Sequence, residues 1–192
     1  MSQLSFFSAE STPPAVDDLA GLLAAPGQVV IVGGGARVSV VVDRPWRAHA
    51  IADMIADCGL TPEIADTDEG HPLVRSVPTP DLMPTARSWT RGAVKAVPAG
   101  WTPGPRALRV WALASGRLAA DGSRFAFGLD PHAPDTHPVL AESLMRVGIA
   151  PTLAGARGST PELRVTGRRR LGRLVDTVGE APPGVMEWPT AP

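Results

Sequence analysis

The sequence lacks the cysteines that a disulfide or a cysteine-based zinc site would require. Cys58 is the only cysteine among 192 residues. A single cysteine excludes an intrachain disulfide and leaves no cysteine cluster to hold zinc. The chain therefore suits a reducing compartment, and we expect it in the cytoplasm.

The sequence also lacks an excess of charge of either sign, and it lacks a long hydrophobic run. Its 18 Lys and Arg residues are balanced by 19 Asp and Glu residues, which gives a formal net charge of −1. This balance excludes a uniformly basic nucleic-acid coat, so any DNA-facing surface must be a local patch. The longest apolar stretch is broken by Pro26 and Gly27, and neither a signal peptide nor a membrane helix is predicted.

Lysine is nearly absent as well, because Lys95 is the only one in the chain. Arginine therefore supplies almost all of the positive charge, and alanine, proline and valine are abundant. This usage is typical of a high-GC bacterial genome, which is a coding bias and carries no information on function. Hydrophobic residues make up 44% of the chain, which favours a folded core.

The chain contains an internal duplication. Residues 19–27 (LAGLLAAPG) match residues 108–116 (LRVWALASG) at an offset of 89 positions, 108 minus 19. Residues 50–65 match residues 139–154 at the same offset, and residues 37–43 (RVSVVVD) match residues 124–130 (RFAFGLD) at 87, which is 124 minus 37. A nearly constant offset along a whole unit predicts two copies of one structural unit.

Each copy has the same predicted order of elements: helix, strand, strand, helix, strand, strand, helix. In the first copy these are helix 19–25, strands 28–32 and 37–42, helix 46–58, strands 62–65 and 73–77, and helix 81–89. In the second they are helix 106–115, a hairpin turning at 121–123, helix 136–147, strands near 152 and 163, and helix 169–178. The predicted fold is α+β, with two tandem αββαββα repeats packed as a pseudo-twofold single-chain dimer.

The predicted organisation has five parts. The first repeat spans residues 15–91 and the second spans residues 106–180. Residues 92–105 are rich in glycine and proline and are predicted to link the repeats. Residues 1–14 and 181–192 are predicted to be tails, the first flexible and the second rich in proline.

The doubled element order, opening with LAGLLAAPG, resembles the LAGLIDADG homing-endonuclease superfamily over residues 17–179. The resemblance implies two signature helices packed side by side at a pseudo-twofold axis, with two saddle-like sheets that sit on DNA. Gly21, Ala24 and Ala25 are small enough to permit close approach of these helices, which is a packing reason independent of the family. The second helix keeps little of the signature beyond Leu108, Ala114 and Gly116.

The acidic residues that bind the catalytic metal in this superfamily are missing. The positions that match them hold Pro26 and Ser115, and neither offers the anionic oxygen that a hard divalent cation needs. We therefore expect no nuclease chemistry, no metal and no cofactor. The chain is most similar to a degenerate, non-cutting branch like the N-terminal domain of the sporulation regulator WhiA, although no helix-turn-helix domain is found here.

Two groups of arginines are candidates for contacting nucleic acid, because arginine donates two hydrogen bonds to phosphate oxygens. The first group lies at strand positions that face away from the helices: Arg37, Arg75, Arg124 and Arg164. The second is a dense basic patch formed by Arg168, Arg169 and Arg170. The alternative for both groups is a set of solvated surface arginines, and Asp43 and Asp130 would oppose a polyanion.

The N-terminal peptide is a candidate partner-binding segment. It consists of Gln3, Leu4, Ser5, Phe6 and Phe7, which resemble the peptide that binds the bacterial sliding clamp. A polar hook followed by apolar side chains suits docking into an apolar cleft. The alternative is that Phe6 and Phe7 pack on the protein's own core.

Two other motifs are interpreted structurally. The run Gly33–Gly34–Gly35 is predicted to be a hairpin turn, because a strand follows it where a dinucleotide-binding motif requires a helix. Asp130, His132, Asp135 and His137 are predicted to form a structural loop. We therefore expect a non-catalytic DNA-associated or regulatory protein that docks on the sliding clamp, and the alternative is a protein–protein interaction scaffold without nucleic-acid binding.

Overall fold

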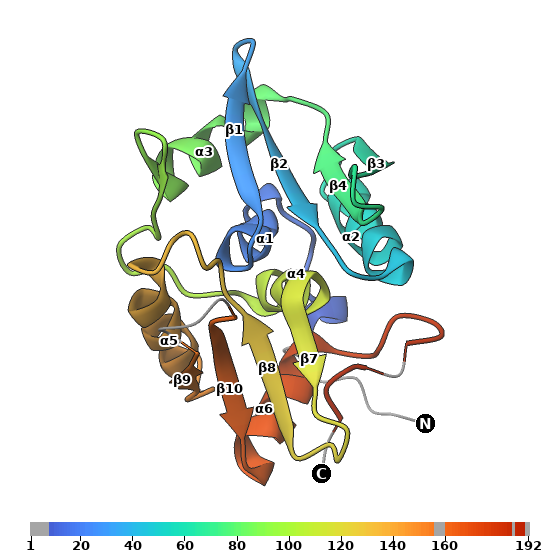
Figure 1. Ribbon diagram of the computed structural model, residues 1–192, viewed down its shortest axis with the longest axis vertical. Coiled ribbons are helices and arrows are strands. Elements are labelled where there is room, and N and C mark those ends of the chain that lie inside the picture. The colour runs from blue at the N-terminus through green and yellow to red at the C-terminus, as the bar shows by residue number, and fades with distance from the viewer. Residues whose placement is uncertain (1–7, 156–159, 186, 191–192) are drawn as a thin grey trace.

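The computed structural model describes residues 8–155, 160–185 and 187–190, and it contains two halves that share one architecture (Figure 1). The first half runs through η2 (Val16–Leu19), α1 (Ala20–Ala24), β1 (Gln28–Val32), β2 (Gly35–Val41), α2 (Pro45–Asp57), β3 (Pro62–Asp66), β4 (Pro72–Ser76), η3 (Pro80–Leu82) and α3 (Met83–Trp89). The second half runs through α4 (Pro105–Ser115), β7 (Gly116–Leu118), β8 (Arg124–Gly128), α5 (Thr136–Arg146), β9 (Thr152–Ala154), β10 (Glu162–Thr166) and α6 (Arg168–Val178).

The two sheets confirm the duplication. Each is a four-stranded antiparallel sheet, with strand order β1-β2-β4-β3 in the first half and β7-β8-β10-β9 in the second. In the first sheet, one row of paired residues consists of Gln28, Ser39, Arg75 and Glu63. The equivalent row in the second sheet consists of Arg117, Ala126, Arg164 and Thr152. The residues correspond one by one at the offsets of 89 and 87, so the α+β two-repeat prediction is confirmed.

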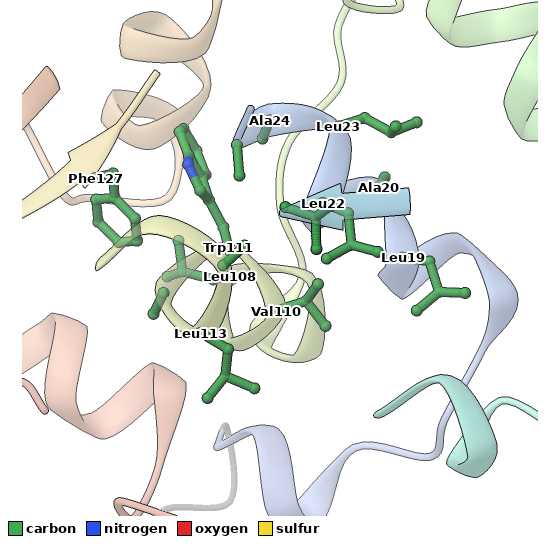
Figure 2. Packing of buried hydrophobic residues seen from close by; sticks show 14 of the residues in the cluster. Leu19, Ala20, Leu22, Leu23, Ala24, Leu108, Val110, Trp111, Leu113 and Phe127 are labelled. Atoms are coloured by element: carbon green, nitrogen blue, oxygen red, sulfur yellow. The ribbon is translucent and has the colours of Figure 1, made fainter. Parts of the chain in front are cut away.

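The helices α1 and α4 lie side by side between the two sheets (Figure 1). Gly21 makes this approach possible, because a Cβ atom built on it would lie 2.1 Å from the carbonyl oxygen of Ala107 and 2.8 Å from the Cβ of Val110. Figure 2 shows the leucines of α1 and the apolar side chains of α4 in this buried centre. Close packing at Gly21 was predicted from its size, and the structure confirms it.

A single hydrophobic core extends through both halves. Leu22 and Leu23 of α1 and Leu108 of α4 are fully buried in it. A series of aromatic rings continues this core from the first half into the second. The ring centroids of Trp89 and Trp101 are 4.9 Å apart, and those of Trp101 and Trp111 are 6.5 Å apart. Trp101 belongs to the segment between the halves, so that segment contributes to the core and does more than connect the repeats.

The glycine run forms the predicted hairpin turn. Val32 pairs with Gly35, and the two residues between them, Gly33 and Gly34, have φ angles of +58° and +86°. Two consecutive positive φ angles match the tight turn that joins antiparallel strands with the correct twist. β2 therefore begins at Gly35, two residues before the predicted strand.

The described residues outside the two repeats include short elements and buried side chains. A small hairpin of β5 (Thr90–Arg91) and β6 (Val94–Lys95) begins the segment between the halves. At the N-terminal side, η1 (Ala9–Ser11) packs against α4, and Ser8 and Ala9 are buried. At the C-terminal side, Trp188 is buried and its indole Nε1 donates a hydrogen bond to the Gly179 carbonyl at 2.8 Å. Ala9 and Trp188 therefore each bury apolar surface.

None of the helices in the described ranges is long and apolar enough to span a membrane.

Candidate nucleic-acid interface

The outer faces of the two sheets carry the first group of predicted arginines. In β2, Val38 and Val40 are buried toward the helices, whereas Arg37 and Ser39 lie on the opposite face. In β8, Phe125 and Phe127 are buried toward the helices and Arg124 is exposed, while Ala126, on the face of Arg124, is also buried. This is the period-two arrangement expected for a sheet with one covered face.

Two of the four sheet arginines are engaged in ion pairs on the same face. Arg75 Nε lies 2.7 Å from Glu63 Oε2, and Arg164 Nε lies 2.6 Å from Glu162 Oε1. Within the described part of the chain, Arg37 and Arg124 make no ion pair. The pair Arg37 and Arg124 is therefore better placed to receive phosphate than the pair Arg75 and Arg164.

The second group of predicted arginines begins α6. Arg168, Arg169 and Arg170 are exposed, while the helix packs through Leu171 and Leu174 on the helical side of the sheet. These arginines border an open groove that also includes Thr166 and Gly167. The seven predicted arginines therefore do not share one surface, because Arg168–Arg170 lie on a different layer from the sheet faces.

One end of the second sheet nevertheless connects the two groups. Arg124 pairs in register with Thr166, and α6 begins two residues after Thr166. β8 therefore begins at the end of the sheet where β10 leads into α6 (Figure 1). No equivalent basic cluster follows β4 in the first half, where residues 77–80 read Val-Pro-Thr-Pro.

Arg117 is a candidate that the sequence reasoning missed. It is exposed on β7, and it stands in the same cross-strand row as Arg164. Its equivalent in the first half is Gln28, which is 89 positions earlier and also occupies an outward-facing position. A comparison of every outward-facing strand position in the two repeats, and not only of the matched arginines, would have identified Arg117.

The outer face of the first sheet differs from that of the second, because it exposes valines among its polar and charged residues. Val30, Val32, Val41 and Val77 are 39%, 42%, 49% and 38% exposed there. In the described part of the second sheet, no large apolar side chain is exposed. The duplicated halves therefore present different chemistry on equivalent faces.

The C-terminal end of α1 is closed by the only lysine of the chain. Lys95 Nζ donates hydrogen bonds to the carbonyls of Ala25 at 2.6 Å and Gly27 at 2.7 Å, and it lies 3.1 Å from Asp130 Oδ2. Burial lowers the pKa of Lys95, while the Asp130 carboxylate opposes that shift. A cation at this position satisfies carbonyls that the helix leaves without donors.

The C-terminal end of α4 is closed by a second cation, Arg47. Its Nη1 donates to the carbonyls of Ala112 at 3.2 Å and Leu113 at 2.7 Å, and its Nη2 donates to Gly116 O at 2.5 Å. Its Nε lies 3.0 Å from Asp43 Oδ1. Burial lowers the pKa of Arg47 and Asp43 opposes the shift, but a guanidinium stays charged at any physiological pH.

The two closures are related by the duplication. Asp43 and Asp130 are equivalent residues at the offset of 87, each two positions after a central strand. Arg47 and Asp43 belong to the first half and close the helix of the second. Asp130 belongs to the second half and anchors Lys95, which closes the helix of the first. We refer to these two arrangements as the crossed caps.

Two carboxylates, those of Asp43 and Glu162, line the space between the ends of α1 and α4. A cavity of about 250 Å³ lies between the helix ends and is lined by Pro26 and Ser115, the two residues at the matched acidic positions. The Ser115 hydroxyl is already used, since it donates to the Gly128 carbonyl at 2.9 Å. No cluster of three or more His, Cys, Asp or Glu residues that could hold a metal occurs within the described ranges.

The aspartate and histidine loop is held by internal hydrogen bonds. The backbone N–H of His132 donates to Asp130 Oδ1 at 2.9 Å, and His137 Nε2 lies 2.8 Å from the Asp130 carbonyl. His137 is buried at the start of α5. These contacts orient Asp130 toward Lys95, so the loop supports a crossed cap. The other predicted site, residues 3–7, lies outside the described residues.

This geometry defines the chain as a protein with a LAGLIDADG-like fold of two tandem repeats. It is similar to full-length DUF199/WhiA from Thermatoga maritima, with a TM-score of 0.61 and 13% identity over 85% of this chain. It covers 54% of that protein, so the chain spans about half the length of this relative.

Two homing endonucleases share the fold. One is I-WcaI bound to its DNA recognition sequence, with a TM-score of 0.61, 8% identity, and coverage of 93% of this chain and 83% of that one. The other is I-DmoI, in a structure of its mesophilic variants, with a TM-score of 0.52 and 12% identity. That match covers 85% of this chain and 94% of the other. No family model and no curated protein matches the sequence.

Proposed function

We propose that the protein binds nucleic acid without cutting it, and that the second half makes most of the phosphate contacts. The observation that carries this proposal is the distribution of arginines without ion pairs. Arg117 and Arg124 are exposed on the outer face of the second sheet, and Arg168–Arg170 are exposed on α6, which begins at the end of that sheet where Arg124 lies. A local basic surface of this kind is what a chain with a net charge of −1 needs in order to bind a polyanion.

The non-catalytic part of the proposal is supported by the crossed caps. Metal-assisted cleavage requires a hard cation at the reacting phosphate, held by anionic oxygens. Here the equivalent helix ends hold an ammonium and a guanidinium, and the carboxylates of Asp43 and Asp130 are paired with them. The Asp130 side chain is only 5% exposed beside Lys95, so a metal ion would have to displace that buried cation to reach it.

We expect duplex DNA to bind in a strongly salt-dependent manner, and we expect the double variant Arg117→Ala/Arg124→Ala to weaken binding. Each lost phosphate contact should reduce the slope of log K against log salt by about 0.9, so the double variant should lose nearly 2. The measurement is fluorescence anisotropy of a labelled duplex across a salt series.

The matched control for this measurement is Arg87→Ala/Arg91→Ala, which removes the same charge from exposed positions on and beside α3. It should leave the slope nearly unchanged. Equal losses in both double variants would show that binding is nonspecific attraction to net charge. Cleaved product in the same samples after incubation with magnesium would overturn the non-catalytic part.

We also propose that residues 3–7 dock the protein on the bacterial sliding clamp, which places its activity in the bacterial cytoplasm. The support is the sequence Gln-Leu-Ser-Phe-Phe, in which a polar hook precedes apolar side chains. A pull-down with purified clamp should retain the intact protein and lose the triple variant Gln3→Ala/Phe6→Ala/Phe7→Ala. The variant should keep its DNA affinity, and equal retention of both proteins on the clamp would contradict the docking.

A second candidate function is a protein–protein interaction scaffold without nucleic-acid binding. The observation that favours it is the set of exposed valines on the outer face of the first sheet, Val30, Val32 and Val41. Exposed apolar groups of this kind mark protein contacts better than phosphate contacts. Absence of DNA affinity even at low salt would select this candidate over the first.

A further inference from the structure

The four edges of the two sheets are protected unequally. An exposed sheet edge carries unpaired backbone groups that can pair with another strand, and proteins guard such edges with charge, proline or short strands. The edge strand β3 contains Pro62, Glu63 and Asp66. The edge strands of the second sheet, β7 and β9, have only three residues each, and β7 includes Arg117.

The remaining edge strand, β1, carries neither charge nor proline and is longer than the edge strands of the second sheet, and α3 packs against it. Its five residues read Gln-Val-Val-Ile-Val, and the sequence contains no charged residue and no proline from Gln28 to Ala36. Ile31 is 56% exposed, and Val30 and Val32 are 39% and 42% exposed. β1 pairs on one side only, with β2. Within the described part of the chain, the N–H groups of β1 donate no backbone hydrogen bond outside this pairing.

We propose that β1 is a self-association surface, on which β1 of a second copy pairs antiparallel about a twofold axis at Val30. A strand of five residues that lacks charge is compatible with its own copy, because no like charges meet across the axis. A partner strand with charged side chains would instead place them against Val30 and Ile31 without an opposite charge. Because charge, proline or short length disfavours pairing at β3, β7 and β9, we expect pairing to occur at β1.

This pairing joins the first halves of two copies and leaves the basic surface of each second half outside the contact. Isologous pairing of this kind closes on itself at two copies, so it does not extend into a filament. The inference does not depend on nucleic-acid binding, because it rests on a different half and on different residues. The result would be one continuous sheet of eight strands across two copies.

Cysteine cross-linking tests the proposed axis. In a Cys58→Ser background, Val30→Cys should form a disulfide-linked dimer under mild oxidation, because residues directly opposite in an antiparallel pair have Cβ atoms about 5 Å apart. The matched controls are Ile64→Cys on the guarded edge strand β3 and Val94→Cys, whose native valine is 65% exposed. Both controls should remain monomeric on a non-reducing gel, although Val94 is more exposed than Val30. Cross-linking of all three variants to the same extent would overturn the proposal.

Sedimentation equilibrium gives an independent readout without cysteines. The unmodified protein should show a concentration-dependent dimer, and Val30→Lys should abolish it, because two ammonium groups would meet at the axis. Val94→Lys adds the same charge elsewhere and should dimerise as the unmodified protein does. If the unmodified protein stayed monomeric across the concentration range, the proposal would be wrong, and β1 would not be a self-association surface. Circular dichroism would verify that both lysine variants are folded.

Discussion

Replacing Gly21 with alanine should lower the free energy of unfolding by about 3 kcal/mol, since the added methyl group would be forced into a neighbouring backbone. The new Cβ would lie 2.1 Å from the Ala107 carbonyl oxygen and 2.9 Å from the Trp111 amide nitrogen. Both atoms belong to the backbone of α4, so neither can rotate away. The two central helices would have to separate, and the core contacts shown in Figure 2 would loosen.

The matched control for this substitution is Gly172→Ala in α6. Gly172 also lies within a helix, but a Cβ built on it meets no atom within 4 Å. Alanine favours a helix over glycine by up to about 1 kcal/mol, so this variant should be slightly more stable than the unmodified protein. Urea denaturation with unchanged m-values would measure both. A Gly21→Ala protein as stable as the unmodified one would show that the helix contact is looser than described.

Replacing Arg47 with methionine should destabilise the protein by about 3 kcal/mol, because three carbonyls at the end of α4 would lose their buried donor. Methionine fills a comparable volume without charge, so the loss reports on hydrogen bonding and electrostatics and not on a cavity. The stability of Arg47→Lys should lie between those of the unmodified protein and Arg47→Met, because one ammonium cannot reach all of the acceptors that the guanidinium contacts. The measurement is again equilibrium denaturation in urea.

Arg44→Met provides the comparison for the Arg47 variants. Arg44 precedes α2 and is exposed, so its loss should change the free energy of unfolding by less than about 0.5 kcal/mol. If Arg47→Met and Arg44→Met were equally stable, the crossed cap at α4 would contribute nothing to the fold. The prediction would then be wrong, and the cation would have to be explained by function alone.

The sequence predicted the fold well because the duplication preserves local patterns. Alternation in residues 37–43 and 124–130 fixed which side chains face the core, and the close approach at Gly21 followed from its size. The offset of 89 even identifies the cross-strand rows, since Gln28 and Arg117 prove to be equivalent. These features depend on periodicity and spacing, which a single sequence displays directly.

The site was less predictable because it depends on contacts between distant segments. Arg75 lies twelve residues after Glu63, and only the strand register brings their side chains together. Lys95 is the single lysine of the chain and lies in the segment predicted to link the repeats. Lys95 closes α1 only because the fold brings it to Ala25, 70 positions earlier, and to Asp130, 35 positions later. A local sequence pattern cannot predict contacts between residues so far apart in the chain.

The fusion of two repeats into one chain allows them to evolve separately. In a symmetric dimer of a single repeat, every substitution would occur twice, and a basic sheet face on one subunit would require the same face on the other. Here Arg117 and Gln28 occupy equivalent positions, as do the exposed cluster at Arg168–Arg170 and the uncharged turn after β4. Covalent linkage therefore permits the two halves to differ, with arginines on the outer surface of one half and exposed valines on the equivalent surface of the other.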